Sequence, residues 1–439
     1  MSPENRELTP ENSTPYTDLF WQRAIAWAMA LPQNDGFVAL LNNNHIAYPN
    51  DPFPNRLFVG AKRVVSVFDG ATESDAFEQL RLAQAERPSY WVGYFGYDLK
   101  NQLETLGSRQ ANRLGFPDAF FAEPRWIIDY QDGVATLTGE GDTETLLAEL
   151  LAYPVPDTQP IIPQSVHCRV TSDAYKATVR QIQQAIREGE VYELNYCVEF
   201  FIEQARLEPE AVYWALNERS PMPFSAFLRL GDRYLMGASP ERFIRKDGMK
   251  LTSQPIKGTI RRGQTIDEDA QLRAQLLGSE KERAENLMIV DLVRNDLARS
   301  AETGSVRVDE LFGIYGFRHV FQMISTISAT LRSDCTWTDA IRNAFPMGSM
   351  TGAPKIRSMV LIDELESSRR GLYSGALGYI TPGNDFDFSV VIRSLLYDSE
   401  RQYASFSVGS AITYDADPEQ EWAECLLKAR AIRSLLEGR

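Results

Sequence analysis

Cysteine, histidine and long apolar runs are scarce in this chain of 439 residues, and each scarcity excludes a class of protein. The four cysteines are widely separated and show no CxxC spacing, which excludes a disulfide-stapled scaffold and a cysteine-rich zinc site. The three histidines have no metal-ligand spacing. No run of about 18 apolar residues occurs, so we expect no membrane span. The polar, acidic N-terminus does not resemble a secretory or transit peptide, which predicts a cytoplasmic protein.

Positive charge is also in short supply. The chain has 45 Lys and Arg against 60 Asp and Glu, a formal net charge of −15. Nucleic acid phosphates require a basic surface, so we exclude nucleic acid as a partner. An anionic substrate would have to be held by a few local cations within an unfavourable overall field.

A proline-rich stretch divides the chain. Its prolines, at positions 154, 156, 160 and 163, predict a linker over residues 153–170. The linker separates an N-terminal region, 1–152, from a larger region, 171–439. Helices and strands come in blocks, and many strands are joined by short turns, which predicts an α+β fold with antiparallel strands.

Local patterns place the elements that matter for function. We expect helices at 19–31, 280–297, 354–366 and 418–436, and a further helix whose N-cap is Ser172. Alternation predicts a hairpin from the strands 234–236 and 242–244, with a turn signal at Asp247–Gly248.

Lys257 lies between an apolar residue and a glycine, shortly after this predicted hairpin in the sequence. The glycine leaves room for a substrate to approach the amine. A lysine acts as a nucleophile only when burial or a neighbouring cation lowers its pKa, and Arg261 and Arg262 could supply that cation. A solvated surface lysine is the alternative.

Two predicted helices carry paired glutamates. Glu282 and Glu285 share a face of one helix, and Glu421 and Glu424 share a face of another. Carboxylates that converge from two helices form an oxygen-rich site suited to Mg²⁺. The alternative is that these glutamates lie on the surface, paired with lysines four residues away.

Three further segments are candidates for binding an anion. The glycine-rich turn over 345–355 opens a helix whose free amides bind anions, and Lys355 adds charge, although a helix-capping loop is the alternative. Arg393 interrupts an apolar strand and needs an anionic partner, either a protein carboxylate or a ligand carboxylate. The small residues Gly409–Ala411 could line a pocket or simply end a strand.

Together these motifs resemble the chorismate-utilising enzymes, the family of the anthranilate, aminodeoxychorismate, isochorismate and salicylate synthases. The similarity covers most of the chain and is dense from Ser172 to Leu436. The motifs that carry it are Ser239–Phe243, Pro255–Thr259, Asp291–Asp296 and Thr351–Lys355. The resemblance implies an α+β fold with a large antiparallel β-sandwich core surrounded by helices, to which both regions contribute.

Within this family the lysine at position 257 is typical of aminodeoxychorismate synthases, whereas anthranilate synthases have alanine there. The resemblance implies that Lys257 attacks C2 of chorismate while the C4 hydroxyl leaves, with Glu241 as the general acid. Ammonia then attacks C4 and expels the lysine, giving 4-amino-4-deoxychorismate for 4-aminobenzoate and folate biosynthesis. Anthranilate synthase component I is the alternative activity, and a non-catalytic chorismate-binding subunit is a third.

The resemblance also implies the binding residues. Glu285 and Glu424 match Mg²⁺ ligands, with Glu282 and Glu421 as their neighbours. The residues that match chorismate-binding groups are Thr351, Lys355, Tyr373, Arg393, Gly409, Ser410 and Ala411.

The chain departs from the family pattern at two positions. Gln322 stands where many relatives have a histidine, which weakens the anthranilate alternative. Glu193 stands where isochorismate-forming relatives have a lysine that activates water and where aminodeoxychorismate synthases have glutamine, so its role is open. No cysteine fits a glutamine amidotransferase nucleophile, so the resemblance implies a separate glutaminase subunit that delivers ammonia.

Overall fold

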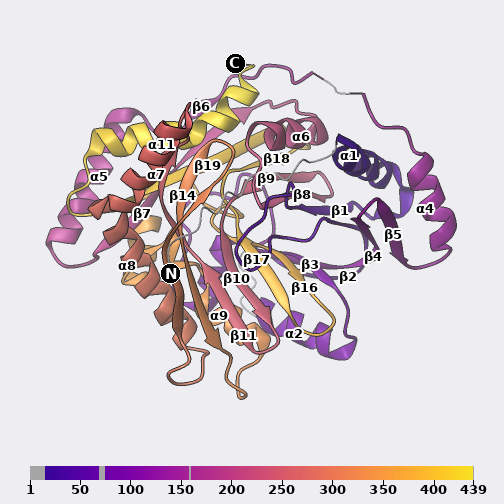
Figure 1. Cartoon of the computed structure of the whole chain (residues 1–439), viewed down its shortest axis with the longest axis horizontal. Coiled ribbons are helices and arrows are strands. Elements are labelled where there is room, and N and C mark those ends of the chain that lie inside the picture. Colours follow the sequence, from indigo (N-terminus) through magenta and orange to yellow (C-terminus); the bar gives the residue numbers. More distant parts are fainter. Residues whose placement is uncertain (1–14, 69–74, 158–159, 439) are drawn as a thin grey trace.

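The computed structural model describes residues 15–68, 75–157 and 160–438, and Figure 1 shows the arrangement of their helices and strands. Parts of the predicted N-terminal region (1–14 and 69–74) and of the predicted linker (158–159) lie outside the described residues, as does residue 439. The α-helices are α1 (Pro15–Ala30), α2 (Ala76–Glu86), α3 (Lys100–Leu103), α4 (Thr143–Ala152), α5 (Ser172–Arg187), α6 (Pro209–Arg219), α7 (Ile266–Gly278), α8 (Glu280–Ala298), α9 (Trp337–Ala344), α10 (Lys355–Leu365) and α11 (Pro418–Leu436).

The strands run through the whole described chain. They are β1 (Phe37–Asn42), β2 (Arg56–Val67), β3 (Trp91–Phe95), β4 (Ala119–Gln131), β5 (Val134–Gly139), β6 (His167–Cys168), β7 (Glu193–Glu203), β8 (Phe224–Leu230), β9 (Arg233–Ser239), β10 (Arg242–Asp247), β11 (Lys250–Gln254), β12 (Ile256–Arg261), β13 (Arg307–Gly316), β14 (Val320–Thr330), β15 (Gly352–Ala353), β16 (Ala376–Ile380), β17 (Phe386–Val390), β18 (Ser394–Asp398) and β19 (Tyr403–Ile412).

These strands form two limbs that diverge from the long strand β4, and all their pairings are antiparallel. The first limb runs β4–β2–β1–β8–β9–β18–β19–β7. The second limb runs β4–β3–β16–β17–β10–β11–β14, and β12 and β13 also pair with β14. The predicted antiparallel α+β fold is therefore confirmed.

The chain crosses from the first limb to the second between β9 and β10 and returns between β17 and β18, and in between only the short strand β15 pairs with the first limb, at β7. The two crossings are adjacent, because the Val390 amide donates to the Glu241 carbonyl (3.0 Å) and the Ala238 amide donates to the Arg393 carbonyl (3.1 Å). The predicted hairpin is wrong in its pairing. In the described structure β9 pairs with β8 and β18, and the Asp247–Gly248 turn joins β10 to β11.

Alternate residues of the second limb face two apolar cores. On β3, Trp91 and Phe95 belong to the core beneath α2, α8 and α9, whereas Val92 and Tyr94 belong to the larger core that also contains the first limb. This separation follows from the two-residue period of a strand. Both faces of β3 are therefore buried, which explains why its sequence is continuously apolar rather than alternating.

The ends of α8, α10 and α11 agree with the sequence patterns to within one residue, whereas α1 begins at Pro15, before the predicted start at residue 19. The N-cap of α5 is Thr171, whose side chain accepts from the Ala174 amide, so the prediction of Ser172 was one residue late. Asp417 caps α11 by accepting from two amides. None of the helices in the described part of the chain is long and apolar enough to cross a bilayer.

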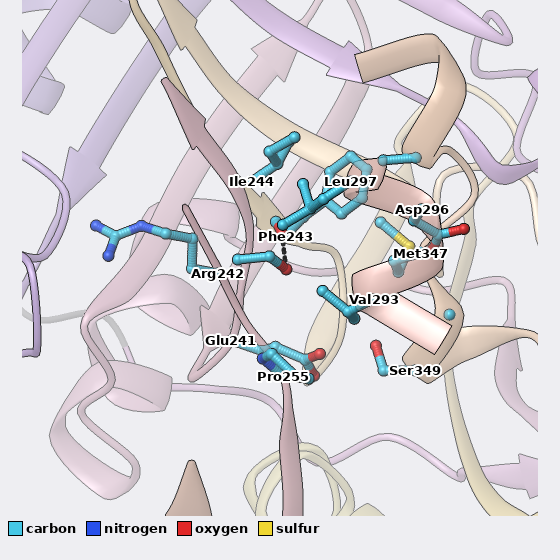
Figure 2. A pocket seen from close by; sticks show the side chains of 13 residues that line it. Glu241, Arg242, Phe243, Ile244, Pro255, Val293, Asp296, Leu297, Met347 and Ser349 are labelled. Atoms are coloured by element: carbon cyan, nitrogen blue, oxygen red, sulfur yellow. Dashed lines mark hydrogen bonds between the residues drawn. The ribbon is translucent and has the colours of Figure 1, made fainter. Parts of the chain in front are cut away.

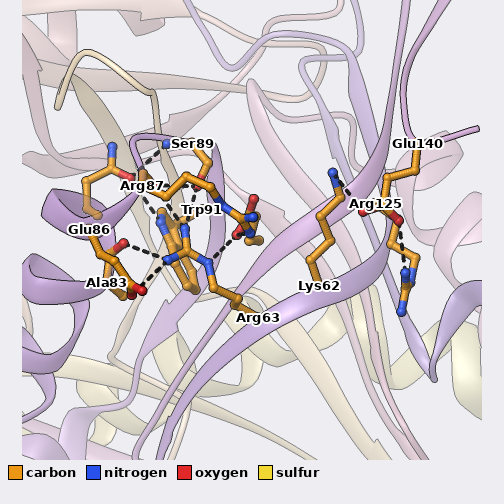
Figure 3. A network of polar contacts seen from close by, with 11 residues as sticks. Lys62, Arg63, Ala83, Glu86, Arg87, Ser89, Trp91, Arg125 and Glu140 are labelled. Atoms are coloured by element: carbon orange, nitrogen blue, oxygen red, sulfur yellow. Dashed lines mark hydrogen bonds and ion pairs between the residues drawn. The ribbon is translucent and has the colours of Figure 1, made fainter.

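The two regions flanking the proline-rich stretch share strand pairings, β1 with β8 and β3 with β16. A polar network also fixes α2 against the N-terminal strands (Figure 3). Arg63 of β2 donates to the Ala83 and Arg87 carbonyls, at 2.9 Å each, pairs with Glu123, and lies over the Trp91 ring. The division into two regions remains a prediction, since strands of both build the same limbs.

Candidate active site

Lys257 occupies the centre of the predicted site, near the start of β12. Its charge acts on carboxyl groups from four different segments, namely Glu193, Glu241, Glu282 and Glu424. Gly258 follows with a φ of 95°, and a Cβ there would lie 3.1 Å from a carboxylate oxygen of Glu282. The glycine therefore lets the strand approach α8 and the acidic residues that it carries.

Glu241 lies at the first crossing between the limbs and is 5% exposed. Burial raises the pKa of its carboxyl group to about 7, against the lowering influence of the Ser349 hydroxyl and of the Lys257 and Arg393 charges. A carboxyl group with this pKa is partly protonated at neutral pH, as a general acid requires. Figure 2 shows Glu241 and Ser349 on the same side of a small cavity.

Lys355 does not present a free ammonium group to this cavity. Its Nζ lies 2.7 Å from Asp296 and donates to the Ala344 carbonyl at 3.1 Å. Burial raises the pKa of Asp296 to about 6 although the Lys355 charge opposes it. The charge of Lys355 is thus already matched within the fold, and its contact with substrate stays a prediction.

Thr351 is fully buried, and its hydroxyl is used within the glycine-rich turn. It donates to the Met347 and Gly348 carbonyls at 3.2 and 3.3 Å, while its own carbonyl accepts from the Asn195 amide at 2.8 Å. These bonds fix the turn against β7. A direct contact between Thr351 and substrate also stays a prediction.

Arg393 lies at the second crossing, beside Glu241, and has a φ of 49°. It forms no ion pair with any described carboxylate, and its Nη1 lies 4.0 Å from the Met222 sulfur. Burial lowers the pKa of Arg393, and the Glu241 charge opposes this. The sequence allowed two partners for Arg393, a protein carboxylate or a ligand carboxylate. The described fold places no protein carboxylate in an ion pair with it, which favours the ligand.

The remaining predicted binding residues meet around β7 and β19. A Cβ on Gly409 would lie 2.5 Å from the Cys197 sulfur, and the Tyr373 hydroxyl lies 3.6 Å from the same sulfur. The Ser410 hydroxyl lies 3.0 Å from the Tyr175 hydroxyl, and Ala411 pairs with Asn195. The fold thus brings Tyr373 and residues 409–411 to one strand pair, while their roles stay predictions.

The four predicted metal ligands gather around Lys281. Its Nζ lies 3.7 Å from Glu285 of the same helix and 3.9 Å from Glu421 of α11. Burial acts to lower the pKa of Lys281, but the charges of all four glutamates outweigh it and raise that pKa. The helix-surface pair Glu424–Lys428 also forms, at 2.7 Å. Both surface ion pairs that the sequence suggested are therefore present beside the cluster.

The donor chemistry of this cluster fits a magnesium ion. Burial and neighbouring carboxylates raise the pKa values of Glu282 and Glu421, so the cluster holds more negative charge than its surroundings favour. The Lys281 ammonium partly offsets that charge, as a divalent cation would. Among the described residues, no three His, Cys, Asp or Glu side chains are arranged to hold a metal ion as they stand. The magnesium site stays a prediction.

Two buried acceptors near Lys257 lack partners among the described residues: Oε2 of Glu193 and Oε1 of Gln322. Gln322 pairs across strands with Thr259, two residues beyond Lys257. The sequence marked both positions as unusual. It did not single out Ser349, although that residue lies inside the glycine-rich turn. It gave Lys281 only as a surface partner of Glu285 and Asp296 only as part of a family motif, because their contacts with Glu421 and Lys355 depend on tertiary structure.

The chain matches known proteins over most of its length. Residues 43–434 match a family described as chorismate binding enzyme. A Streptomyces griseus protein named aminodeoxychorismate synthase is 40% identical over 367 residues, covering 79% of this chain and 50% of that protein. The chain therefore spans about half the length of this relative.

A shorter relative and a solved structure also match most of this chain. Aminodeoxychorismate synthase component 1 of Escherichia coli (strain K12) is 36% identical over 349 residues, covering 79% of this chain and 76% of that protein. The structure of anthranilate synthase component I from Streptococcus pneumoniae TIGR4 has a TM-score of 0.76 at 26% identity, covering 92% of this chain and 93% of that one.

Proposed function

This chain belongs to the family of chorismate-binding enzymes, and on that premise we propose that it converts chorismate and ammonia to 4-amino-4-deoxychorismate. The observation that carries the proposal is the placement of Lys257 among buried carboxyl groups, one of which has a pKa of about 7. The names of the relatives in Streptomyces griseus and Escherichia coli support the same reaction.

Each residue has a role that its surroundings support. The Lys257 amine forms a bond to C2 of chorismate, the two ring double bonds shift, and the C4–oxygen bond breaks. Protonated Glu241 gives its proton to the departing oxygen, so that water leaves. Ammonia then bonds to C4, the double bonds shift back, and the lysine nitrogen leaves C2. The Glu241 carboxylate takes the proton released by the new amine and is restored.

Charge on the substrate is matched locally. Arg393, which forms no ion pair with a described carboxylate, binds the enolpyruvyl carboxylate beside the Tyr373 and 409–411 segment. Glu285 and Glu424 would hold Mg²⁺, with Glu282 and Glu421 beside them. When bound, Mg²⁺ supplies positive charge that neutralises the ring carboxylate.

We further propose that ammonia comes from a separate glutamine amidotransferase subunit, since the Escherichia coli relative is named as one component of its enzyme. Free ammonium at high concentration should replace that subunit. A cytoplasmic location remains part of the proposal.

The proposal is tested by incubating the chain with chorismate, Mg²⁺ and ammonium, followed by an aminodeoxychorismate lyase. We expect 4-aminobenzoate from the wild type and a loss of at least about 1,000-fold in Lys257→Ala, because the covalent step has no substitute nucleophile. Lys250→Ala, on the neighbouring strand β11 with a half-exposed side chain, is the control and should keep its rate. A wild type that is inert with both ammonium and a cognate glutaminase would contradict the proposal.

Anthranilate synthase is the second candidate, favoured by the similarity to the Streptococcus pneumoniae structure. Its products are fluorescent anthranilate and pyruvate, neither of which aminodeoxychorismate formation releases. Anthranilate in the same assay, or pyruvate formed before the lyase is added, would establish the alternative, because the lyase itself releases pyruvate when it forms 4-aminobenzoate.

A further inference from the structure

Glu366 and Arg370 form a buried ion pair that the reaction proposed above leaves unused. They follow α10, and their side chains are each 3% exposed. Two hydrogen bonds join them, from Nε of Arg370 at 2.9 Å and from its Nη2 at 2.6 Å. A buried ion pair is weak evidence for stability, because the cost of removing both charges from water offsets their attraction. Stability alone therefore does not account for this pair.

The other donors of Arg370 hold oxygen atoms from three separate segments. Nη1 donates to the Met350 carbonyl of the glycine-rich turn at 2.5 Å and to the Ser374 hydroxyl, before β16, at 3.4 Å. Nη2 donates to the Asn195 carbonyl of β7 at 2.8 Å. A guanidinium group has five N–H donors in a fixed planar arrangement, and here each of them has an acceptor. The group therefore fixes the turn, β7 and the segment before β16 relative to one another.

Glu366 connects the same ion pair to the predicted binding residues. Its Oε1 also accepts from the Cys197 amide at 2.9 Å. Cys197 pairs across strands with Gly409, and its sulfur lies 3.6 Å from the Tyr373 hydroxyl. The Tyr373 amide in turn donates to the Arg370 carbonyl at 3.0 Å. Two residues predicted to bind chorismate are thus connected to the ion pair, Tyr373 directly and Gly409 through Cys197.

We propose that Glu366 and Arg370 are positioning residues that hold the chorismate-binding segments in their relative places. The proposal rests on the proposed function, since chorismate is the molecule to be held. The pair acts through the glycine-rich turn, β7 and Tyr373, which surround the predicted site for the enolpyruvyl carboxylate. Its hydrogen bonds do not extend to Lys257 or Glu241. Loss of the pair should therefore weaken substrate binding more than the covalent step.

The test replaces both partners, in the double variant Glu366→Met with Arg370→Met, so that no unpaired charge remains in the interior. Buried ion pairs replaced in this way often keep or gain stability, so the double variant should fold. We expect KM for chorismate to rise at least about tenfold, because small displacements of binding groups are costly. At saturating ammonium and Mg²⁺, kcat should stay within about threefold.

Arg433 and Glu437 supply a matched control. They are the same two residue types, also four positions apart, and form an ion pair of 2.9 Å at the end of α11. Their double methionine variant should keep the wild-type KM. Circular dichroism confirms that each variant is folded.

Arg370→Lys separates charge from geometry. An ammonium group keeps the charge but has three donors and no planar fork, so it cannot hold all the acceptors that the guanidinium holds. We expect KM to rise in this variant as well, whereas a pair needed only for its charge would be rescued by lysine. The lysine variant also supplies the result if the double methionine variant does not fold.

Chorismate binding is measured separately, as the thermal stabilisation of each variant by chorismate and Mg²⁺, which requires no turnover. A folded double variant with wild-type KM and wild-type stabilisation would overturn the positioning role and leave the proposed function intact. A fall in kcat with KM unchanged would also overturn it. A wild type that makes no aminodeoxychorismate, yet is stabilised by chorismate more strongly than the double variant, would contradict the proposed function and support the positioning role.

Discussion

Glu241 has opposite effects on stability and on catalysis. Its carboxyl group has a pKa of about 7 in the folded chain against an ordinary value of 4.5. Below pH 4.5 it is protonated in both states. As pH rises from 4.5 to 7, the unfolded chain loses this proton more readily than the folded chain, so the free energy of unfolding falls. The group therefore costs about 3 kcal/mol of stability at pH 8 relative to acid pH.

Glu241→Gln should remove this cost, because the amide cannot ionise. We expect the difference in free energy of unfolding, variant minus wild type, to be about 3 kcal/mol larger at pH 8 than near pH 4.5. The variant should also lose at least about 100-fold in kcat, because the amide cannot donate the proton. Urea unfolding at the two pH values measures the first effect. A variant-to-wild-type difference that does not change with pH would show that the Glu241 carboxyl group titrates as an exposed one does.

Arg393 should affect binding more than turnover. In Arg393→Gln we expect KM for chorismate to rise about 10- to 100-fold, the loss of a charge-assisted hydrogen bond of about 1.5–3 kcal/mol, with a smaller change in kcat. The Arg393 charge lowers the pKa of Glu241. In Arg393→Gln that pKa should rise, so the basic limb of the pH profile should move to higher pH. The exposed Arg401→Gln is the control. An unchanged KM would remove Arg393 from the binding site.

Single residues also show the limit of sequence analysis. Lys257, Glu241 and the four helix glutamates were identified from their local motifs, and the fold brings them together. Lys355 was identified in the same way, yet it pairs with Asp296, which lies 59 positions earlier. A local motif indicates which residue types are present, but it cannot show which buried charge already has a partner.

Helices α8 and α11 each contribute two glutamates to one cluster, and Lys281 lies between the two helices. In Lys281→Met the four glutamates lose this ammonium, so a divalent cation should bind more tightly. We expect the Mg²⁺ concentration at half-maximal thermal stabilisation to fall about five- to tenfold, equivalent to about 1 kcal/mol. Arg294→Met, at a half-exposed position of α8, is the control. An unchanged midpoint would mean that the cluster does not bind the cation.

Strand pairing shows why elements were easier to predict than their arrangement. The continuous apolar sequence of β3 and the cap at Asp417 are local signals, and both elements form as expected. The hairpin prediction failed because β9 and β10 are neighbours in sequence and belong to different limbs. The chain turns away at Pro240–Glu241, and the partners of β9 are β8 and β18. Such pairings depend on contacts distant in sequence, which alternation does not encode.

At the scale of the whole molecule, the two limbs explain how distant segments reach one site. Lys257 and Gln322 come from the second limb, Glu193 and residues 409–411 come from the first, and Glu241 and Arg393 lie where the chain passes between them. The N-terminal strands β2 and β3 join both limbs through β4. Activity of the 171–439 region alone is therefore not expected, since removing those strands would separate the limbs.

The overall charge of −15 opposes the approach of an anionic substrate, whereas Lys257 and Arg393 attract it locally. The screening length is about 30 Å at 0.01 M salt and about 8 Å at 0.15 M, so added salt removes distant repulsion first and leaves contacts within the site. We therefore expect kcat/KM for chorismate to rise about two- to threefold between these salt concentrations, at constant free Mg²⁺, with kcat unchanged. Steady-state kinetics in potassium chloride measures this. A fall in kcat/KM would mean that the local cations already dominate the field along the whole approach, and that the acidic surface does not repel the substrate.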